Sequence, residues 1–180
     1  MRKVKCKFCE LMEDKENMVK HGNRYVHQTC LDEHMKSKKD RAELEDYILK
    51  VHGISTIPNN FFYALADLKN GTIRRGNSTR KGSNGYSYAT ILATYKKYSG
   101  NIKYAKETKN FHGSTYNLLK YTLAIIKDKV DSVDRIRKKE LIKRKDEVRL
   151  SKQIKGFDNE NKKVEYKVRD SGDISDFIDN

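Results

Sequence analysis

Two pairs of residues near the N-terminus have the types and the spacing of a metal site. Cys6 and Cys9 are separated by two residues, and His27 and Cys30 repeat that gap after seventeen intervening residues. A two-residue gap lets both side chains of a pair reach the same ion, and two such pairs supply the four nitrogen and sulfur ligands of a structural zinc site. We therefore predict one structural Zn2+ held by Cys6, Cys9, His27 and Cys30.

One ligand of this set has a competitor. His34 lies one helical turn beyond Cys30, so it is an alternative to His27 as the histidine ligand. With either histidine, four protein ligands leave no coordination position open for water or substrate. The zinc is therefore predicted to be structural, and we expect neither a small-molecule substrate nor an enzyme activity.

The residues between the two ligand pairs predict a small hairpin. Met18–Lys20 and Arg24–Val26 have the pattern of short strands, and His21-Gly22-Asn23 between them suits a tight turn. A helix is expected to begin just after His27. Together with the ligand spacing, this order resembles the treble-clef zinc finger, and in particular the first finger of LIM domains, which implies a zinc-bound ββα module. The resemblance covers residues 1–35, and a second LIM finger is absent because the chain has no further cysteines.

Treble clefs also occur in nucleases of the HNH type, where a histidine and an asparagine beside the finger serve a catalytic metal. Here His21 and Asn23 belong to the predicted turn, and His52 and His112 lack acidic or histidine neighbours of the right kind. A nuclease is therefore only a minor alternative.

The rest of the chain has the apolar spacing of helices. Residues 28–52 form either one helix or two, because Asp40 followed by Glu43 is typical of a helix start, and Gly53 is the expected end. Further helices are expected from Pro58 to Asn70, over 88–98 and over 101–111. A last helix carries a heptad-like seam and continues as a charged helix to residue 154. The seam consists of Leu119, Leu123, Ile126, Val130 and Val133.

The predicted fold is therefore mainly α, with a small N-terminal ββα treble-clef zinc module, a helical body and a long C-terminal charged helix. We expect a zinc-finger module over 1–36, a basic helical domain over 37–154, and a disordered, acidic-leaning tail over 155–180. The tail assignment rests on its polar composition.

Positive charge is concentrated in one part of the sequence. The net charge is +14, and residues 69–109 hold ten basic residues and one acid, Glu107. Such a segment favours a polyanionic partner, and we expect nucleic acid, DNA rather than RNA. Residues 72–85 are expected to be a loop that contacts phosphates, although a lysine-rich connector without a partner would have the same composition. The candidate contacts are Arg74, Arg75, Arg80, Lys81, Lys96 and Lys97.

Residues 88–133 resemble the C-terminal helical module of DnaD-like replication and phage proteins. The resemblance rests on Ile102-Lys-Tyr-Ala105 and on the stretch from Leu119 to Ile126, although the tryptophan usual after that helix is missing. It implies DNA binding. The whole chain also resembles the small zinc-finger proteins of phages and prophages of low-GC Gram-positive bacteria.

Two functions follow from these patterns. The first is a zinc-dependent nucleic-acid-binding protein of a phage, acting in transcription regulation or replication. The second is a phage protein-interaction module that binds a host complex such as RNA polymerase or a defence enzyme. Because no window is apolar enough to span a bilayer and no secretion signal is evident, we expect no membrane association and a cytoplasmic location in the bacterial host cell.

Overall fold

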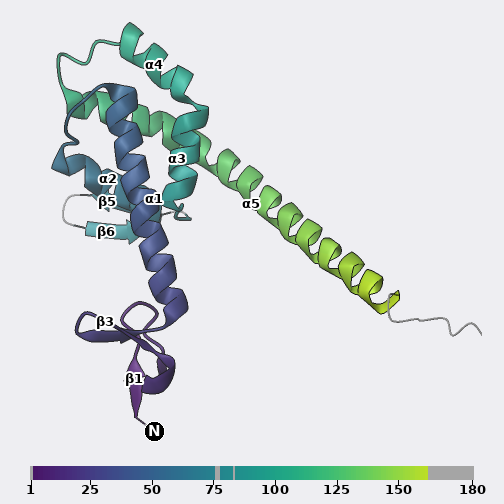
Figure 1. Cartoon of the computed structure of the whole chain (residues 1–180). Coiled ribbons are helices and arrows are strands. Elements are labelled where there is room, and N and C mark those ends of the chain that lie inside the picture. Colours follow the sequence, from purple (N-terminus) through teal and green to yellow (C-terminus); the bar gives the residue numbers. More distant parts are fainter. Residues whose placement is uncertain (1, 76–77, 83, 162–180) are drawn as a thin grey trace, which may run out of the picture. The chain divides into compact units, whose positions relative to one another are not determined.

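The computed structural model describes residues 2–75, 78–82 and 84–161, with the backbone alone for Arg75 and for 152–161. The chain divides into two compact units, residues 1–137 and 138–180. The first unit contains short strands near its N-terminus, followed by helices (Figure 1). Among the described residues, no helix is both long enough and apolar enough to cross a membrane.

Two small hairpins and a short helical turn form the N-terminal part. Strands β1 (Lys3–Lys5) and β2 (Met12–Asp14) pair antiparallel, and the 3-10 helix η1 (Lys15–Asn17) follows. Strands β3 (Val19–His21) and β4 (Arg24–Val26) form the second hairpin, whose turn contains Gly22 at a φ of 61°. The second hairpin was predicted and the first was not.

The core of this N-terminal part is very small. Among its described side chains, only Cys6, Met18 and Val26 are fully buried, with partly buried neighbours around them. So few apolar residues cannot offset the entropy of ordering the chain, and small modules of this kind depend on a metal or another cross-link.

Helix α1 (Gln28–His52) settles the question of one helix or two. It runs without a break through Asp40, where the Arg41–Glu45 ion pair of 2.6 Å joins successive turns. It ends at Gly53, which takes a left-handed φ of 65°, as predicted. Its first turn carries Cys30, and its last two turns bury Ile48 and His52.

The helical body consists of α2 (Asn59–Asn70), α3 (Tyr88–Lys97), α4 (Ser99–Thr108) and the first half of α5 (Thr115–Asn161), packed with the C-terminal half of α1. Phe61 and Tyr95 are its largest fully buried side chains. Burial of one large apolar side chain contributes about 1.5–3 kcal/mol. The core residues are Leu44, Ile48, Phe61, Leu65, Leu68, Ile91, Leu92, Tyr95, Ile102, Leu119, Leu123, Ile126 and Val130.

Residues 72–85 are not simply the loop that the sequence predicts. Strands β5 (Thr72–Arg75) and β6 (Ser78–Lys81) form an antiparallel hairpin in which Arg75 pairs with Ser78. The signal was the Gly-Asn dipeptide at positions 76–77, a common two-residue hairpin connection, between runs containing threonine and Ile73. The composition of glycine, serine and basic residues hid this pattern.

Helix α5 buries the predicted seam. Leu119, Leu123, Ile126 and Val130 are each at most 2% exposed, whereas Ile136 is 45% exposed, so the seam ends where predicted. The helix continues to Asn161 and includes the first residues of the expected tail. The rest of that tail, residues 162–180, lies outside the described residues, so the division into three domains stays a prediction.

Candidate metal centre

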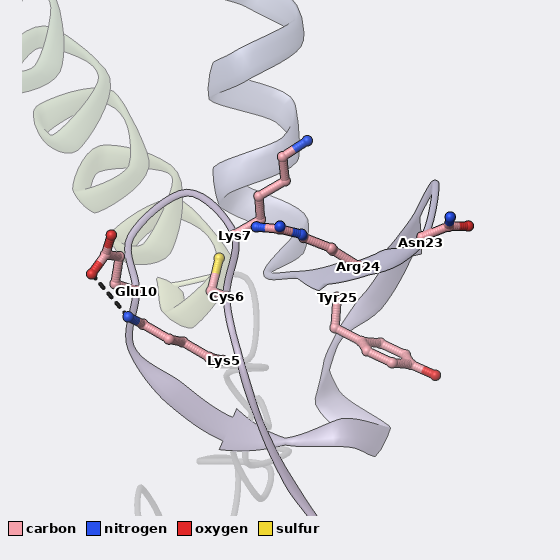
Figure 2. A pocket seen from close by; sticks show the side chains of 7 residues that line it. All are labelled: Lys5, Cys6, Lys7, Glu10, Asn23, Arg24 and Tyr25. Atoms are coloured by element: carbon pink, nitrogen blue, oxygen red, sulfur yellow. Dashed lines mark hydrogen bonds and ion pairs between the residues drawn. The ribbon is translucent and has the colours of Figure 1, made fainter.

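A tight loop between β1 and β2 carries the first ligand pair. The N–H of Cys6 donates to the carbonyl oxygen of Leu11 at 2.9 Å, and the N–H of Glu10 donates to the carbonyl oxygen of Cys6 at 3.1 Å. Glu10 has a left-handed φ of 65°, which turns the chain back after Cys9. Lys5 and Glu10 form an ion pair of 2.9 Å across the loop (Figure 2).

The second ligand pair lies where β4 passes into α1. His27 is the residue before the helix, and Cys30 lies in its first turn. The backbone carbonyl of His27 accepts from Leu31 at 3.0 Å, so the helix is already formed where the imidazole leaves the backbone. The N-terminus of a helix favours negative charge, so this position suits Cys30 when it binds a metal as a thiolate.

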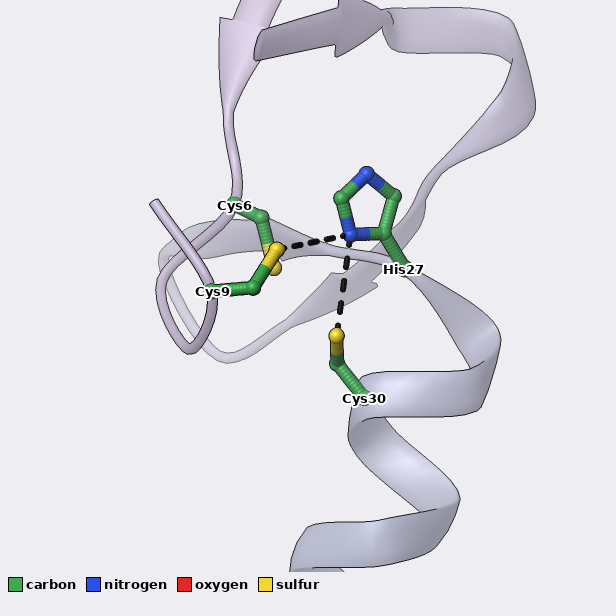
Figure 3. Close-up of side chains that lie close together, drawn as sticks. All are labelled: Cys6, Cys9, His27 and Cys30. Carbon is green, nitrogen blue, oxygen red and sulfur yellow. Dashed lines mark hydrogen bonds between the residues drawn. The ribbon is translucent and has the colours of Figure 1, made fainter. Parts of the chain in front are cut away.

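The four predicted ligands meet at one point (Figure 3). Their ligand atoms all lie within 4.8 Å of one another, and Nδ1 of His27 lies 3.2 Å from Sγ of Cys9 and 3.7 Å from Sγ of Cys30. Around a tetrahedral ion with Zn–S and Zn–N bonds of the usual length, such atoms would be roughly 3.6 Å apart. The cluster therefore fits a metal ion.

His34, the alternative ligand, is not part of this cluster. Its ring stacks on Phe8 with a centroid distance of 4.4 Å. His27 is therefore the histidine that the fold brings to the three cysteines.

The other ring nitrogen of His27 has a carboxylate partner. Nε2 lies 2.9 Å from Oε2 of Glu13, a residue of β2. A histidine that donates to a carboxylate through one nitrogen presents the other to the metal in a fixed tautomer, and such outer partners tune metal sites. Sequence reasoning missed Glu13, because only the β1–β2 pairing brings it beside His27.

The pKa values of two thiols in the cluster, Cys6 and Cys30, shift in opposite directions. Burial raises the pKa of Cys6, but hydrogen bonds from the backbone at Cys9, His27 and Phe8 outweigh it and lower the value to about 6. Burial and the neighbouring sulfurs of Cys9 and Cys6 raise the pKa of Cys30 to about 11. A thiolate at Cys30 is thus disfavoured beside the other two sulfurs, and a bound divalent ion would offset this effect.

The predicted nucleic-acid contacts lie on two elements. Arg74, Arg80 and Lys81 belong to the β5–β6 hairpin, and Arg75 joins it through its backbone. Lys96 and Lys97 lie in the last turn of α3. These two lysines lie about eight residues beyond the first residue of α3, which corresponds to roughly 12 Å along the helix axis.

Several of these cations rest on tyrosine rings. The guanidinium of Arg74 lies 4.9 Å from the ring centre of Tyr63 and 3.4 Å from Oδ1 of Asp67. The amines of Lys96 and Lys97 each lie 5.9 Å from a tyrosine ring centre. All three distances to ring centres are within the roughly 6 Å range over which a cation is attracted to the face of an aromatic ring.

Two tyrosines of the basic segment 69–109, Tyr86 and Tyr104, differ in how free their side chains are. Tyr104 is 66% exposed. The hydroxyl of Tyr86 instead donates to Asp131 at 2.8 Å, and burial together with that carboxylate raises its pKa to about 12. Tyr86 is thus held by α5.

Residues 6–176 match the family described as SPbeta prophage protein YorH. The chain belongs to this prophage family. The YorH match includes all four residues of the metal cluster and the whole helical body. It confirms the expected phage or prophage character, whereas the resemblances to LIM fingers and to DnaD-like proteins stay predictions.

The chain is similar to the SPbeta prophage-derived uncharacterized protein YorH of Bacillus subtilis (strain 168). The two are 33% identical over 55 residues, which is 31% of this chain and 35% of the relative. The chain thus matches about a third of that relative's length. No solved structure matches the chain.

Proposed function

We propose that the chain is a nucleic-acid-binding prophage protein, acting in transcription regulation or replication, in which one structural zinc ion holds an N-terminal treble-clef module. The basic β5–β6 hairpin, called the basic ribbon below, would contact DNA. The observation that carries the proposal is that every residue of β6, including Arg80 and Lys81, is exposed on a strand pair whose own residues include no acid.

The basic ribbon is anchored at its base, and the side chains of β6 are exposed. The N–H of Gly82 donates to the carbonyl oxygen of Gly71 at 2.9 Å, and the hydroxyl of Thr72 donates to Asp67 at 2.8 Å. The strands beyond these bonds carry the arginines. A two-stranded ribbon fits the major groove of B-form DNA, whereas the major groove of A-form RNA is too deep and narrow for side chains to read.

The strand register distributes positive charge over both faces of the ribbon. Arg74 pairs with Thr79, and Thr72 pairs with Lys81, so Arg74 and Lys81 share one face. Arg80 pairs with Ile73 and lies on the other. A ribbon with cations on both faces is suited to a groove, because phosphates border a groove on both sides.

Zinc is the metal that the ligand set favours. Three cysteines and one histidine in a closed tetrahedral arrangement are typical of structural zinc, and the soft sulfur ligands disfavour magnesium and calcium. The order of ligand loop, hairpin and helix supports a treble clef. Four protein ligands also leave the metal without a position for substrate, which supports a binding rather than a catalytic protein.

The test is DNA binding by fluorescence anisotropy at several salt concentrations. We expect duplex affinity to fall with salt at a slope of about 0.9 per neutralised phosphate. A ribbon variant should lose affinity on every sequence and show a shallower slope. The ribbon variant has alanine at Arg74, Arg75, Arg80 and Lys81.

The control removes the same charge elsewhere. Its four positions are exposed in α1 and lie outside the ribbon. If this variant weakens binding as much as the ribbon variant does, or if the wild type does not bind duplex, the ribbon is not the contact surface. The control variant has alanine at Lys36, Lys38, Lys39 and Lys50.

Binding to a host protein complex is the second candidate function. Leu11 and Met12 are 66% and 59% exposed beside the metal cluster, and exposed apolar side chains of this kind are common in protein interfaces. A host protein that co-purifies after nuclease treatment, and that is lost with Leu11→Ser and Met12→Ser together, would favour this function over DNA binding.

A further inference from the structure

A pocket of about 350 Å³ lies in the metal module beside the cysteine loop (Figure 2). Its walls come from the Cys6 loop and from the turn and strand of the second hairpin. Basic side chains outnumber acidic ones around it, by three to one. The lining residues are Lys5, Cys6, Lys7, Glu10, Asn23, Arg24 and Tyr25.

The pocket is a fixed part of the fold. The backbone N–H of Lys7 donates to the carbonyl oxygen of Tyr25 at 3.1 Å and ties the two walls together. The next N–H, that of Phe8, is directed at Sγ of Cys6 at 3.5 Å. The backbone N–H groups of Cys6, Lys7 and Glu10 are all engaged within the fold, so on this wall an anion would be held by side chains.

The cationic side chains of the pocket differ in how free they are to bind an anion. Lys5 is engaged by Glu10 at 2.9 Å, so these two charges offset each other. The amine of Lys7 lies 5.9 Å from the ring centre of Phe8, a contact that leaves its N–H donors available. Arg24 has no acidic partner among the described residues, and its guanidinium can bind an anion with two parallel hydrogen bonds.

The charge balance stays positive even with zinc bound. Three basic side chains and one acid give +2 around the pocket. Three thiolates, a neutral imidazole and Zn2+ add one negative charge behind Cys6. The net charge is then +1, and Lys7 and Arg24 are the two lining cations that Glu10 does not pair with.

We propose that this pocket binds a phosphate group, with Arg24 and Lys7 as its main ligands. Planar, two-pronged donation by arginine together with a point charge from lysine is the chemistry that recognises phosphate oxygens. The pocket is separate from the basic ribbon. This proposal rests on the proposed function in one respect, because the bound metal is needed to fold the module.

The test is titration of the zinc-loaded full chain with inorganic phosphate at low ionic strength, followed by amide chemical shifts. We expect saturable shifts centred on Lys7, Arg24 and Tyr25. Arg24→Gln with Lys7→Gln should weaken phosphate binding by about tenfold or more, because charge-assisted hydrogen bonds are lost. Arg24→Lys should weaken phosphate binding less, since lysine keeps the positive charge and loses only the two parallel N–H donors of the guanidinium.

Lys20→Gln is the matched control. Lys20 is exposed on β3, in the same module, and does not line the pocket. Zinc content and far-ultraviolet circular dichroism establish that each variant is folded. Equal phosphate affinity in the wild type and in the folded double variant with Arg24→Gln and Lys7→Gln would overturn the proposal. Phosphate binding that does not saturate would overturn it as well.

A second titration distinguishes the source of the phosphate. An oligonucleotide that competes with inorganic phosphate identifies the ligand as a nucleic-acid backbone, and lack of competition identifies a free phosphate compound. The ribbon variant should retain phosphate binding. If phosphate binding is absent while duplex binding persists, the pocket proposal fails and the ribbon proposal stands.

Discussion

His27 uses its two ring nitrogens for different purposes. Nδ1 is directed at the sulfurs of Cys9 and Cys30, and Nε2 lies 2.9 Å from the carboxylate of Glu13. In the neutral ring, donation from Nε2–H to this carboxylate leaves the nitrogen that faces the sulfurs available to a metal.

Replacing Glu13 should weaken metal binding without removing a ligand. We expect Glu13→Gln to lower zinc affinity about 10–100-fold, because the amide holds the tautomer less strongly than the carboxylate does. Competition with a chromophoric chelator measures the change. Glu16→Gln, in η1 of the same module, is the control, and equal affinities in both variants would show that Glu13 does not orient His27.

His52 is a buried histidine of the helical body. It is 1% exposed, its Nε2 lies 3.4 Å from the hydroxyl of Thr122, and its Nδ1 has no partner among the described residues. Burial, assisted by the charge of Lys106, lowers its pKa to about 4.

This lowered pKa predicts loss of stability in acid. The unfolded chain takes up a proton at His52 near pH 6.5 and the folded chain only near 4, so the stabilisation is complete above pH 6.5 and is lost as the pH falls towards 4. Between pH 7 and pH 5 the loss should be about 2 kcal/mol. Urea unfolding at both pH values measures it.

The contribution of His52 is isolated by comparing the pH dependence of unfolding between variants, because the metal ligands also titrate. His52→Gln should reduce the pH dependence of unfolding of the helical body by about the same 2 kcal/mol. His112→Gln, at an exposed site, should leave it unchanged. An unaltered pH dependence in His52→Gln would contradict the assignment.

At the scale of elements, α1 and α2 end in the same way. Gly53 and Gly71 follow them with φ values of 65° and 66°, and each donates its N–H to a carbonyl of the last helical turn. A left-handed residue at this position closes a helix, and side chains are disfavoured there.

Two glycine substitutions should therefore have opposite effects. Gly53→Ala is expected to cost about 1 kcal/mol, because alanine is strained at positive φ. Gly100→Ala, in the first turn of α4 with nothing within 4 Å of the new methyl group, should stabilise by a few tenths to about 1 kcal/mol. Thermal unfolding of both variants tests the pair, and a loss in both would mean that Gly100 has another role.

Elements with strong periodicity were predictable from sequence, and elements set by pairing were not. The apolar spacing of α1 and α5 and the stop at Gly53 were confirmed, because helix signals are local. The sequence predicted a loop where the basic ribbon lies, because the strand register depends on a two-residue connection within a polar segment. Likewise, the cysteine and histidine spacing predicted the metal cluster, but Glu13 reaches it only through the β1–β2 pairing.

At the scale of the whole molecule, two hydrophobic clusters of very different size lie in the first unit. The smaller contains Cys6, Met18 and Val26, and the larger draws on α1 to α5. The larger does not include the metal ligands. The stability of the two parts should therefore respond differently to the metal.

Removing the metal should unfold only the smaller part. With a strong chelator, or with Cys9→Ser, we expect loss of near-ultraviolet signals from the N-terminal module while most helical signal remains, because zinc supplies on the order of 10 kcal/mol to folding of such modules. Circular dichroism and elemental analysis follow the change. Thr29→Ser, between the ligands His27 and Cys30, serves as the control. A Cys9→Ser protein that keeps one zinc ion and its near-ultraviolet signals would contradict the ligand assignment.

The close approach of three sulfurs has a consequence for handling the protein. Their ligand atoms lie within 4.8 Å of one another, and Cys9 is exposed. Once the ion leaves, an oxidant can join two of the sulfurs as a disulfide, while the third stays a thiol because the number is odd. Apoprotein exposed to air would then not recover zinc until a reductant is added, so metal loss and oxidative damage would look alike in storage.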